Sequence, residues 1–280
     1  MATTIADIEV VPLSNACGAE IRGVDLTKPL DEEAFKKIEA AWFDHLLIVF
    51  RGQNISNDDQ VRFCRYFGDL EEVRTGKFAN EEMRHTMMIT NVTDTGFQTA
   101  LEDGEMWFHS DQCYYEIPCR ASTLYAMELP RVGGNTLFAN CYAAWEALPG
   151  ELRKKLAGLK ARNIYDYAGN PVTRGDNIDP NAPQYFHPVA RTHPATGRKA
   201  LYVNRLMIDM IEGLPEDESE ETLKQLFEHS EKSEFVYEHV WKIGDLVMWD
   251  NRCSMHARTH FDPNERRMMR RITVKGEAVR

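Results

Sequence analysis

The chain has 280 residues, of which 43% are hydrophobic, and it carries a formal net charge of −11 at pH 7. With a mean hydropathy of −0.47, it has the composition of an ordinary globular protein, long enough for one large domain or two small ones. The acidic balance argues against a nucleic-acid-binding protein, which needs a basic face for phosphates, but a few buried arginines can still bind a small anion.

In the first third of the chain, short strands alternate with helices. Alternating or wholly apolar runs predict strands at 8–13, 19–26 and 46–50. Residues 31–45 predict a helix, because apolar residues recur at helical spacing behind an acidic first turn. A second helix is expected over 56–68, with Ser56 as its N-cap and Gly68 at its end.

The rest of the chain is richer in strands. Strand patterns cover residues 87–92, 107–115, 121–129, 135–140, 199–204, 235–241, 245–251 and 270–276. Helical patterns cover 141–159, interrupted near Pro149, and the acidic segment 215–230. The polar segment 163–188 predicts a long loop, and such loops are commonly lids over active sites or disordered insertions. Together these elements indicate a mainly β fold, a sandwich or barrel with helical insertions, built as a single domain over 1–280.

The N-terminus and the cysteines bear on where the protein works. The opening "MATTIADIEVVPLS" has no basic flank followed by a long apolar run, so no signal peptide is visible. No stretch approaches the roughly 18 apolar residues that span a membrane. The six cysteines include no C-x-x-C pair, which argues against a zinc ribbon. We therefore expect a cytoplasmic protein with reduced thiols that binds neither a membrane nor nucleic acid.

Three residues form a candidate metal site. His109 and Asp111, in "WFHSDQCYYE", are two positions apart, so on a strand they project to the same side. Such a triplet also arises by chance in half-buried strands. With His256, in "WDNRCSMHAR", they make two imidazoles and one carboxylate, a ligand set typical of non-haem Fe(II) oxygenases. A zinc hydrolase can use the same ligand types, so the triad alone leaves both classes open.

Two arginines favour the oxygenase. Arg267 and Arg271 lie four positions apart in "ERRMMRRIT", a segment that alternates like a strand. A buried guanidinium offers a rigid fork for a carboxylate, and a hydrolase has no obvious need for two of them. The alternative is a solvated basic edge strand, which the interleaved Met268 and Met269 fit poorly.

Over nearly its whole length, the sequence resembles the iron(II)/2-oxoglutarate-dependent dioxygenases of the taurine dioxygenase and dichlorophenoxyacetate dioxygenase (TauD/TfdA) family. The stretches that carry the resemblance are "GAEIRGVDLTKPLDEEAF", "FHSD", "ELPRVGGNTLFAN", "HPVARTHPATGRKALYVN", "WDNRCSMHAR" and "RRMMRRIT". The resemblance implies a double-stranded β-helix, a cupin-like jelly roll. It also implies Fe(II) as the metal, with 2-oxoglutarate and O2 as co-substrates and succinate and CO2 as products.

The resemblance also implies roles for individual residues. The iron ligands, and so the catalytic residues, are His109, Asp111 and His256. Thr136 and Arg267 match the residues that bind the far carboxylate of 2-oxoglutarate, and Arg271 matches the arginine that grips an anionic substrate. The positions that match the substrate pocket are Tyr165, Tyr167 and Met207. Beside the ligands, Trp107, Phe108 and Trp249 are expected to form a dry wall, although simple core packing explains them equally well.

The substrate is the least determined feature. Where the taurine enzyme has a sulfonate-binding histidine, this chain has Val73, with Arg74 and Lys77 nearby as replacement cations. The segment "EFVYEHVWKIGDLVMWDNRC" resembles the aryloxyacetate branch more than the taurine branch. We therefore expect hydroxylation of an aromatic or aryloxy carboxylate by a homo-oligomeric enzyme. An alkyl sulfonate is the second choice, and a zinc hydrolase or a non-catalytic metal-binding module is more remote.

Overall fold

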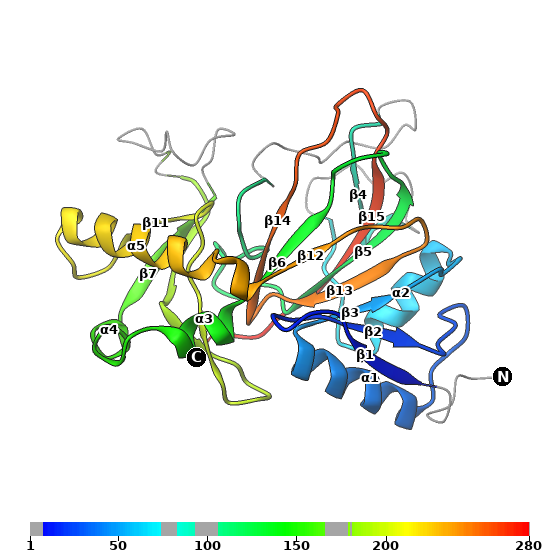
Figure 1. Ribbon diagram of the computed structural model, residues 1–280, viewed down its shortest axis with the longest axis horizontal. Coiled ribbons are helices and arrows are strands. Elements are labelled where there is room, and N and C mark those ends of the chain that lie inside the picture. Colours follow the sequence, from blue (N-terminus) through cyan, green and yellow to red (C-terminus); the bar gives the residue numbers. More distant parts are fainter. Residues whose placement is uncertain (1–7, 74–82, 93–105, 166–178, 180, 280) are drawn as a thin grey trace.

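The described part of the chain folds into four β-sheets with helices packed against them (Figure 1). The computed structural model describes residues 8–73, 83–92, 106–165, 179 and 181–279. The strands are β1 (Glu9–Pro12), β2 (Ala19–Arg22), β3 (Leu47–Phe50), β4 (Thr86–Thr90), β5 (Ala121–Glu128), β6 (Thr136–Asn140), β7 (Lys160–Ile164), β8 (Gln184–Pro188), β9 (Ala190–Thr192), β10 (Lys199–Leu201), β11 (Ile208–Ile211), β12 (Val236–His239), β13 (Leu246–Asp250), β14 (Ser254–Arg258) and β15 (Met268–Val274). The helices are α1 (Glu32–His45), α2 (Asn57–Arg65), α3 (Cys141–Ala147), α4 (Gly150–Leu156), α5 (Glu216–Ser230) and the short 3-10 helix η5 (Ser233–Phe235).

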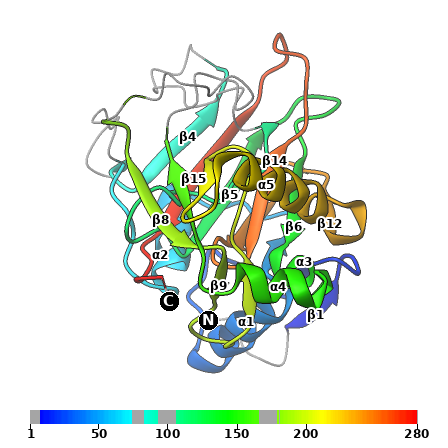
Figure 2. The same ribbon diagram turned by 90° about the vertical axis from the view of Figure 1, so that its left-hand side faces the viewer.

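Two of the sheets form the jelly roll predicted from the sequence. The larger has seven strands in the order β1-β2-β3-β13-β5-β15-β4, and the three-stranded sheet β12-β6-β14 faces it. A shared cluster of buried side chains joins them, with Val49 and Leu124 from the large sheet and Phe138 and Met255 from the small one. Figure 2 shows the two layers, with β4 and β15 on one side and β6 and β14 on the other. The mainly β fold with helical insertions is thus confirmed.

The central strands of the large sheet are buried on both faces. In β13, Val247 and Trp249 face the small sheet, whereas Leu246 and Met248 face the core under α1 and α2. Successive side chains of a strand point to opposite faces, so a strand buried on both sides reads as a continuous apolar run. This explains why the short apolar runs of the sequence predicted strands correctly.

A second group of elements lies beside the jelly roll, on the left of Figure 1. The sheet β11-β7-β8 and the pair β10-β9 pack there with α3, α4 and α5. Trp145 of α3 and Leu226 of α5 belong to the buried cluster that joins them. No helix in the described part of the chain is both long and apolar enough to cross a membrane.

The first two helices begin where the sequence predicts. The Asp31 side chain accepts a hydrogen bond from the backbone N–H of Ala34, at the start of α1. Ser56 and Asp59 form a reciprocal capping box at the start of α2. The helix α2 ends at Arg65, three residues before the predicted stop at Gly68.

Several predictions of secondary structure were wrong, and the strands β7, β8, β9 and β11 were not predicted. Residues 107–115 form a single bridge at His109 followed by a turn, not a strand. The ends of the predicted loop 163–188 belong to strands, because β7 pairs with β8 from Lys160 to Ile164. Residues 166–178 and 180, and with them most of the predicted lid, lie outside the described residues. The strand β14, which carries His256, was not predicted.

The arginine-rich segment is an internal strand, not a solvated edge. It forms β15, which pairs with β5 on one side and β4 on the other. Neighbouring arginines point to opposite faces: Arg270 donates to Gln60 Oε1 at 2.7 Å on the α2 side, while Arg271 faces the small sheet. The alternation of a strand therefore divides the arginines between structure and site.

Candidate active site

His109, Asp111 and His256 meet between the two sheets of the jelly roll. His109 and His256 form an isolated antiparallel bridge, in which each backbone N–H donates to the other carbonyl, at 2.9 and 2.8 Å. The bridge brings their ring centroids within 4.2 Å. The turn that begins at Asp111 places its Oδ1 3.9 Å from His109 Nε2 and 3.8 Å from His256 Nε2. One carboxylate oxygen thus faces two imidazole nitrogens, and all three side chains are buried.

Both imidazoles are in the neutral form that binds metals. Burial, reinforced by His109 and Arg271, lowers the pKa of His256 to about 3 despite the nearby Asp111. Burial also lowers the pKa of His109. His109 Nδ1 lies 2.8 Å from the carbonyl oxygen of Trp107, to which it can donate, leaving the lone pair of Nε2 directed at the other ligands.

The Asp111 carboxylate is held on both sides. Its Oδ2 accepts a hydrogen bond from the Ser122 hydroxyl at 2.6 Å, and its Oδ1 lies 2.7 Å from Arg271 NH2. Burial alone would raise the pKa of Asp111, but the Arg271 guanidinium, the two imidazoles and Ser122 hold it well below its usual range. The group is therefore a carboxylate at neutral pH.

This donor set fits a divalent iron ion. The ligand atoms of His109, Asp111 and His256 all lie within 4.8 Å of one another. Two neutral imidazoles and one carboxylate on one side of a cavity, with the other side open, match the facial arrangement of non-haem Fe(II) enzymes. A zinc ion accepts the same ligands, so the surrounding cavity has to distinguish the two.

The cavity beside the histidines has about 390 Å³ of open space and a cationic lining. Arg258, Arg267 and Arg271 all line it. Its apolar wall consists of Ile89, Leu124 and Trp249, and the lining is completed by His109, Thr136, His256 and Ala257. A small cavity with three guanidiniums and an apolar wall is suited to a compact dianion, because a buried anion needs cationic partners.

Thr136 and Arg267, the residues predicted to bind the far carboxylate of 2-oxoglutarate, both line this cavity. Arg267 directly precedes β15, is 2% exposed, and donates through Nε to the Gly134 carbonyl at 3.3 Å. Thr136, the first residue of β6, accepts a hydrogen bond from the indole N–H of Trp241 at 3.0 Å. Gly134 permits the close packing, since an added Cβ would lie 3.2 Å from Arg267 Nε. The "GGNT" motif and the arginine thus form one unit.

The predicted substrate residues fall into two groups. Tyr165 is 39% exposed and stacks obliquely on Tyr114, with ring centroids 4.7 Å apart. Met207 is buried and lies against Cys113, with the two sulfur atoms 3.4 Å apart. Neither residue is among the described residues that line the cavity. Tyr167 and Arg74 lie outside the described residues, so all four assignments stay predictions.

The expected dry wall is only partly present. Trp249 lies in the cavity wall, with its ring 4.7 Å from that of His256, and Phe108 is buried. Trp107 instead points outward with 37% of its surface exposed, and it contributes through its carbonyl oxygen.

Sequence reasoning missed several residues at the site. Arg258 lines the cavity because it lies two positions after His256 on β14 and therefore projects to the same face. Recognition of β14 as a strand would have revealed it. Trp241 and Ser122 act through hydrogen bonds to Thr136 and Asp111, and no spacing pattern in the sequence points to such pairs.

Comparison with known proteins places this site in context. The family model described as "Taurine catabolism dioxygenase TauD, TfdA family" matches residues 9–273. The chain is 36% identical to the alpha-ketoglutarate-dependent 2,4-dichlorophenoxyacetate dioxygenase of Cupriavidus pinatubonensis, covering 96% of this chain and 98% of that protein. It is 34% identical to pentalenolactone F synthase of Streptomyces avermitilis, covering 96% and 94%. The crystal structure of AAD-2 in complex with Mn(II) and N-oxalylglycine superposes with a TM-score of 0.81 at 30% identity, covering 96% and 97%.

Proposed function

The chain belongs to the TauD/TfdA family of dioxygenases, and from this we propose that it hydroxylates an aromatic or aryloxy carboxylic acid at iron held by His109, Asp111 and His256. It is a 2-oxoglutarate-dependent dioxygenase that uses Fe(II), 2-oxoglutarate and O2. The zinc hydrolase and the non-catalytic module are therefore set aside.

Bound Fe(II) would supply the oxidising chemistry, in which O2 gives one oxygen atom to 2-oxoglutarate, forming succinate and CO2, and the other to a substrate C–H bond, forming C–OH. The protein binds, orients and shields the reactants. His109 and His256 supply neutral nitrogen ligands and Asp111 supplies one charge. Trp249 and Leu124 keep water from one wall of the cavity.

The single observation that carries this proposal is the cationic cavity that opens beside the three ligands. Arg267 and Thr136 are placed to bind the far carboxylate of 2-oxoglutarate, one by charge and one by a hydroxyl hydrogen bond. We assign Arg271 to the substrate anion. It lines the same cavity, but its guanidinium contacts the Asp111 carboxylate. An acidic substrate would draw this guanidinium away from the ligand.

The choice of an aryloxy carboxylate draws on the dichlorophenoxyacetate dioxygenase at 36% identity. An alkyl sulfonate is the second candidate, because the family description includes taurine catabolism and a guanidinium binds sulfonate as well as carboxylate.

A panel of acids tests this choice. The protein is loaded with Fe(II) anaerobically and then given O2, 2-oxoglutarate and either phenoxyacetate, phenylacetate, taurine or ethanesulfonate. We expect succinate to form in step with oxidised product only for the two carboxylates. Phenoxyacetate hydroxylated at its methylene should collapse to phenol and glyoxylate, which are easily measured. Coupled turnover of the sulfonates alone would reverse the order of the candidates.

Three further predictions concern the compartment, the assembly and the domain organisation of the protein. All six cysteines are free and buried, which supports a reducing compartment such as the cytoplasm. The homo-oligomer stays a prediction, to be measured by light scattering on the purified protein. The single domain likewise stays a prediction, and one cooperative unfolding transition would support it.

A further inference from the structure

The side chain of Asn251 lies directly behind Asp111, with both its donors and its acceptor engaged. Its Oδ1 accepts from the backbone N–H of Asp111 at 3.3 Å and from the Trp249 indole at 3.0 Å. Its Nδ2 donates to Ser122 Oγ at 3.1 Å and to Cys119 Sγ at 3.3 Å. We propose that Asn251 is a positioning residue that, through Ser122, fixes which oxygen of Asp111 faces the metal. The proposal rests on the function proposed above.

Ser122 links Asn251 to the Asp111 carboxylate through two hydrogen bonds. A hydroxyl has one proton to donate. Because Ser122 Oγ accepts from Asn251 Nδ2, its proton is free to point at Asp111 Oδ2, 2.6 Å away. This bond occupies Oδ2 and leaves Oδ1 as the oxygen that faces the two imidazoles. The side-chain amide of Asn251 also accepts from the Asp111 backbone N–H. Asn251 therefore fixes both the position of Asp111 and the rotation of its carboxylate.

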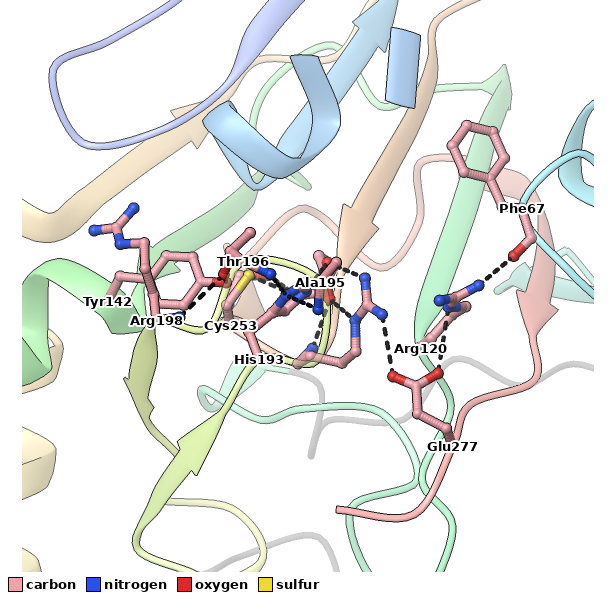
Figure 3. Close-up of polar contacts among 12 residues, drawn as sticks. Phe67, Arg120, Tyr142, His193, Ala195, Thr196, Arg198, Cys253 and Glu277 are labelled. Carbon is pink, nitrogen blue, oxygen red and sulfur yellow. Dashed lines mark hydrogen bonds and ion pairs between the residues drawn. The ribbon is translucent and has the colours of Figure 1, made fainter. Parts of the chain in front are cut away.

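A buried ionic network holds the turn that carries Asn251. Its neighbours Asp250 and Arg252 form a bidentate ion pair, in which Arg252 Nε and NH2 donate to the two Asp250 oxygens at 2.8 and 2.7 Å. His193 Nε2 lies 3.0 Å from Asp250 Oδ2, and Arg252 NH1 lies 3.1 Å from Glu277 Oε1 near the C-terminus. Figure 3 shows His193 and Glu277 among the polar contacts of this network. Asn251 thus lies in a turn whose two flanking residues are held by ion pairs.

His193, Asp250 and Cys253 also meet the distance requirements of a metal site. Their hydrogen bonds argue for a scaffold. His193 Nδ1 accepts from two backbone N–H groups of the following turn, so Nε2 carries the proton and donates to Asp250. Both Asp250 oxygens already accept from Arg252, which leaves this carboxylate committed to the ion pair.

Two substitutions test the role of Asn251. Ser122→Ala removes only the hydroxyl that fixes Asp111 Oδ2, and Asn251→Ala removes the amide behind it. Loss of a group that orients a metal ligand typically costs about 10- to 100-fold in metal affinity. We expect a loss of this size for Co(II) in anaerobic titrations, with a changed visible spectrum because the carboxylate can rotate. Ser230→Ala, which removes an equally buried hydroxyl far from the site, should keep both affinity and spectrum.

The double variant separates this role from general destabilisation. Since the Ser122 hydroxyl orients Asp111 only while Asn251 holds it, Ser122→Ala/Asn251→Ala should bind Co(II) about as weakly as Asn251→Ala. Losses that add up, or Ser122→Ala binding like the wild type, would overturn the proposal. If Asn251→Ala fails to fold, the Co(II) affinity of Ser122→Ala compared with that of Ser230→Ala still tests the proposal. His256→Ala is the reference: if it binds Co(II) normally, the proposed metal site itself is wrong, and the failure lies there.

Discussion

The hydroxyl of Thr136 illustrates how one contact at the residue scale can set the affinity for a co-substrate. Thr136 Oγ1 accepts from Trp241, so its own proton is available to a carboxylate bound beside Arg267. Trp241→Phe keeps an aromatic side chain, smaller than the indole, but removes the N–H donor, and Thr136 is then free to turn its hydroxyl. A net hydrogen bond contributes about 0.5–1.5 kcal/mol, so we expect the dissociation constant of 2-oxoglutarate to rise roughly 2- to 10-fold.

Trp145→Phe is the matched control for this experiment. Trp145 and Trp241 are both 7% exposed, but Trp145 packs against α5, away from the cavity. Anaerobic calorimetry with metal-loaded protein measures 2-oxoglutarate binding to each variant. Equal affinities for the Trp241 and Trp145 variants would show that the indole hydrogen bond does not prepare Thr136.

Arg271 is expected to oppose the metal until the substrate arrives. Its NH2 lies 2.7 Å from Asp111 Oδ1, the oxygen that also faces both imidazoles. Two cations cannot share that oxygen without mutual repulsion. Arg271→Gln should therefore tighten metal binding without substrate, by roughly 3- to 10-fold after screening and side-chain movement. It should also raise the KM of the acidic substrate by at least about 10-fold, because a charge-assisted pair is lost.

The control for Arg271→Gln is a substitution that changes the net charge equally. Arg266→Gln removes an exposed guanidinium that pairs with Glu128 outside the cavity. Metal titration of both variants separates a local effect from a global one. Weaker metal binding by Arg271→Gln would mean that the guanidinium supports the ligand instead of competing for it.

At the scale of elements, the turn that leads into β6 positions Thr136 and Arg267, the two residues predicted to bind 2-oxoglutarate. Gly134 has a positive φ of 66°, and an added Cβ would lie 3.2 Å from Arg267 Nε and 3.1 Å from Pro130 Cγ. Gly134→Ala should displace the guanidinium and raise the KM for 2-oxoglutarate by roughly 10-fold, since a displacement of tenths of an ångström weakens a directed ion pair. Backbone strain of about 1–2 kcal/mol should accompany this effect.

Gly52→Ala is the control that separates the contact between the added methyl group and Arg267 from the backbone strain of a positive φ. Gly52 has a similar φ of 61° with no atom within 4 Å of the added Cβ. We expect both variants to lose similar stability in urea unfolding, whereas only Gly134→Ala should lose affinity for 2-oxoglutarate. A normal KM for Gly134→Ala would show that Arg267 adjusts to the methyl group at no cost.

How well each element was predicted depends on whether its signal is local. The helices α1 and α2 have caps and apolar spacing within their own segments, and both were found. The strand β14 lacks such a signal, because it is buried along its whole length and includes Ser254, His256 and Arg258. Residues 107–115 have strand-like composition, but their bridge partner His256 is remote and the turn at Asp111 ends the pairing.

At the scale of the whole molecule, the jelly roll unites residues that the sequence separates. Residue type and family resemblance were enough to select His109, Asp111 and His256 as candidate ligands, and the fold brings these three side chains together. Residue type and resemblance could not reveal the pairing of Arg271 with Asp111 or the position of Asn251 behind it. Those contacts depend on how β5, β13 and β15 lie side by side in one sheet.

The same burial that prepares the site should make the metal-free protein sensitive to acid. Burial lowers the pKa of His187 from 6.5 to about 4, and it also lowers those of His109, His239 and His256. Below pH 6.5 the unfolded chain binds protons at these residues while the folded chain does not. Stability is therefore present above this pH and is lost as the pH falls toward the folded pKa values.

The variant His187→Gln measures how much His187 contributes to this loss of stability in acid. His187 Nε2 lies 2.8 Å from the Tyr115 carbonyl oxygen, so His187→Gln can keep a donor there while removing the titration. If the unfolded state binds one proton more than the folded state, the free energy of unfolding changes by about 1.4 kcal/mol per pH unit. Between about pH 6 and 4.5, the free energy of unfolding of the variant should fall less steeply by up to that amount. Urea unfolding of both metal-free proteins checks this, and parallel curves would mean that folding does not shift the pKa of His187.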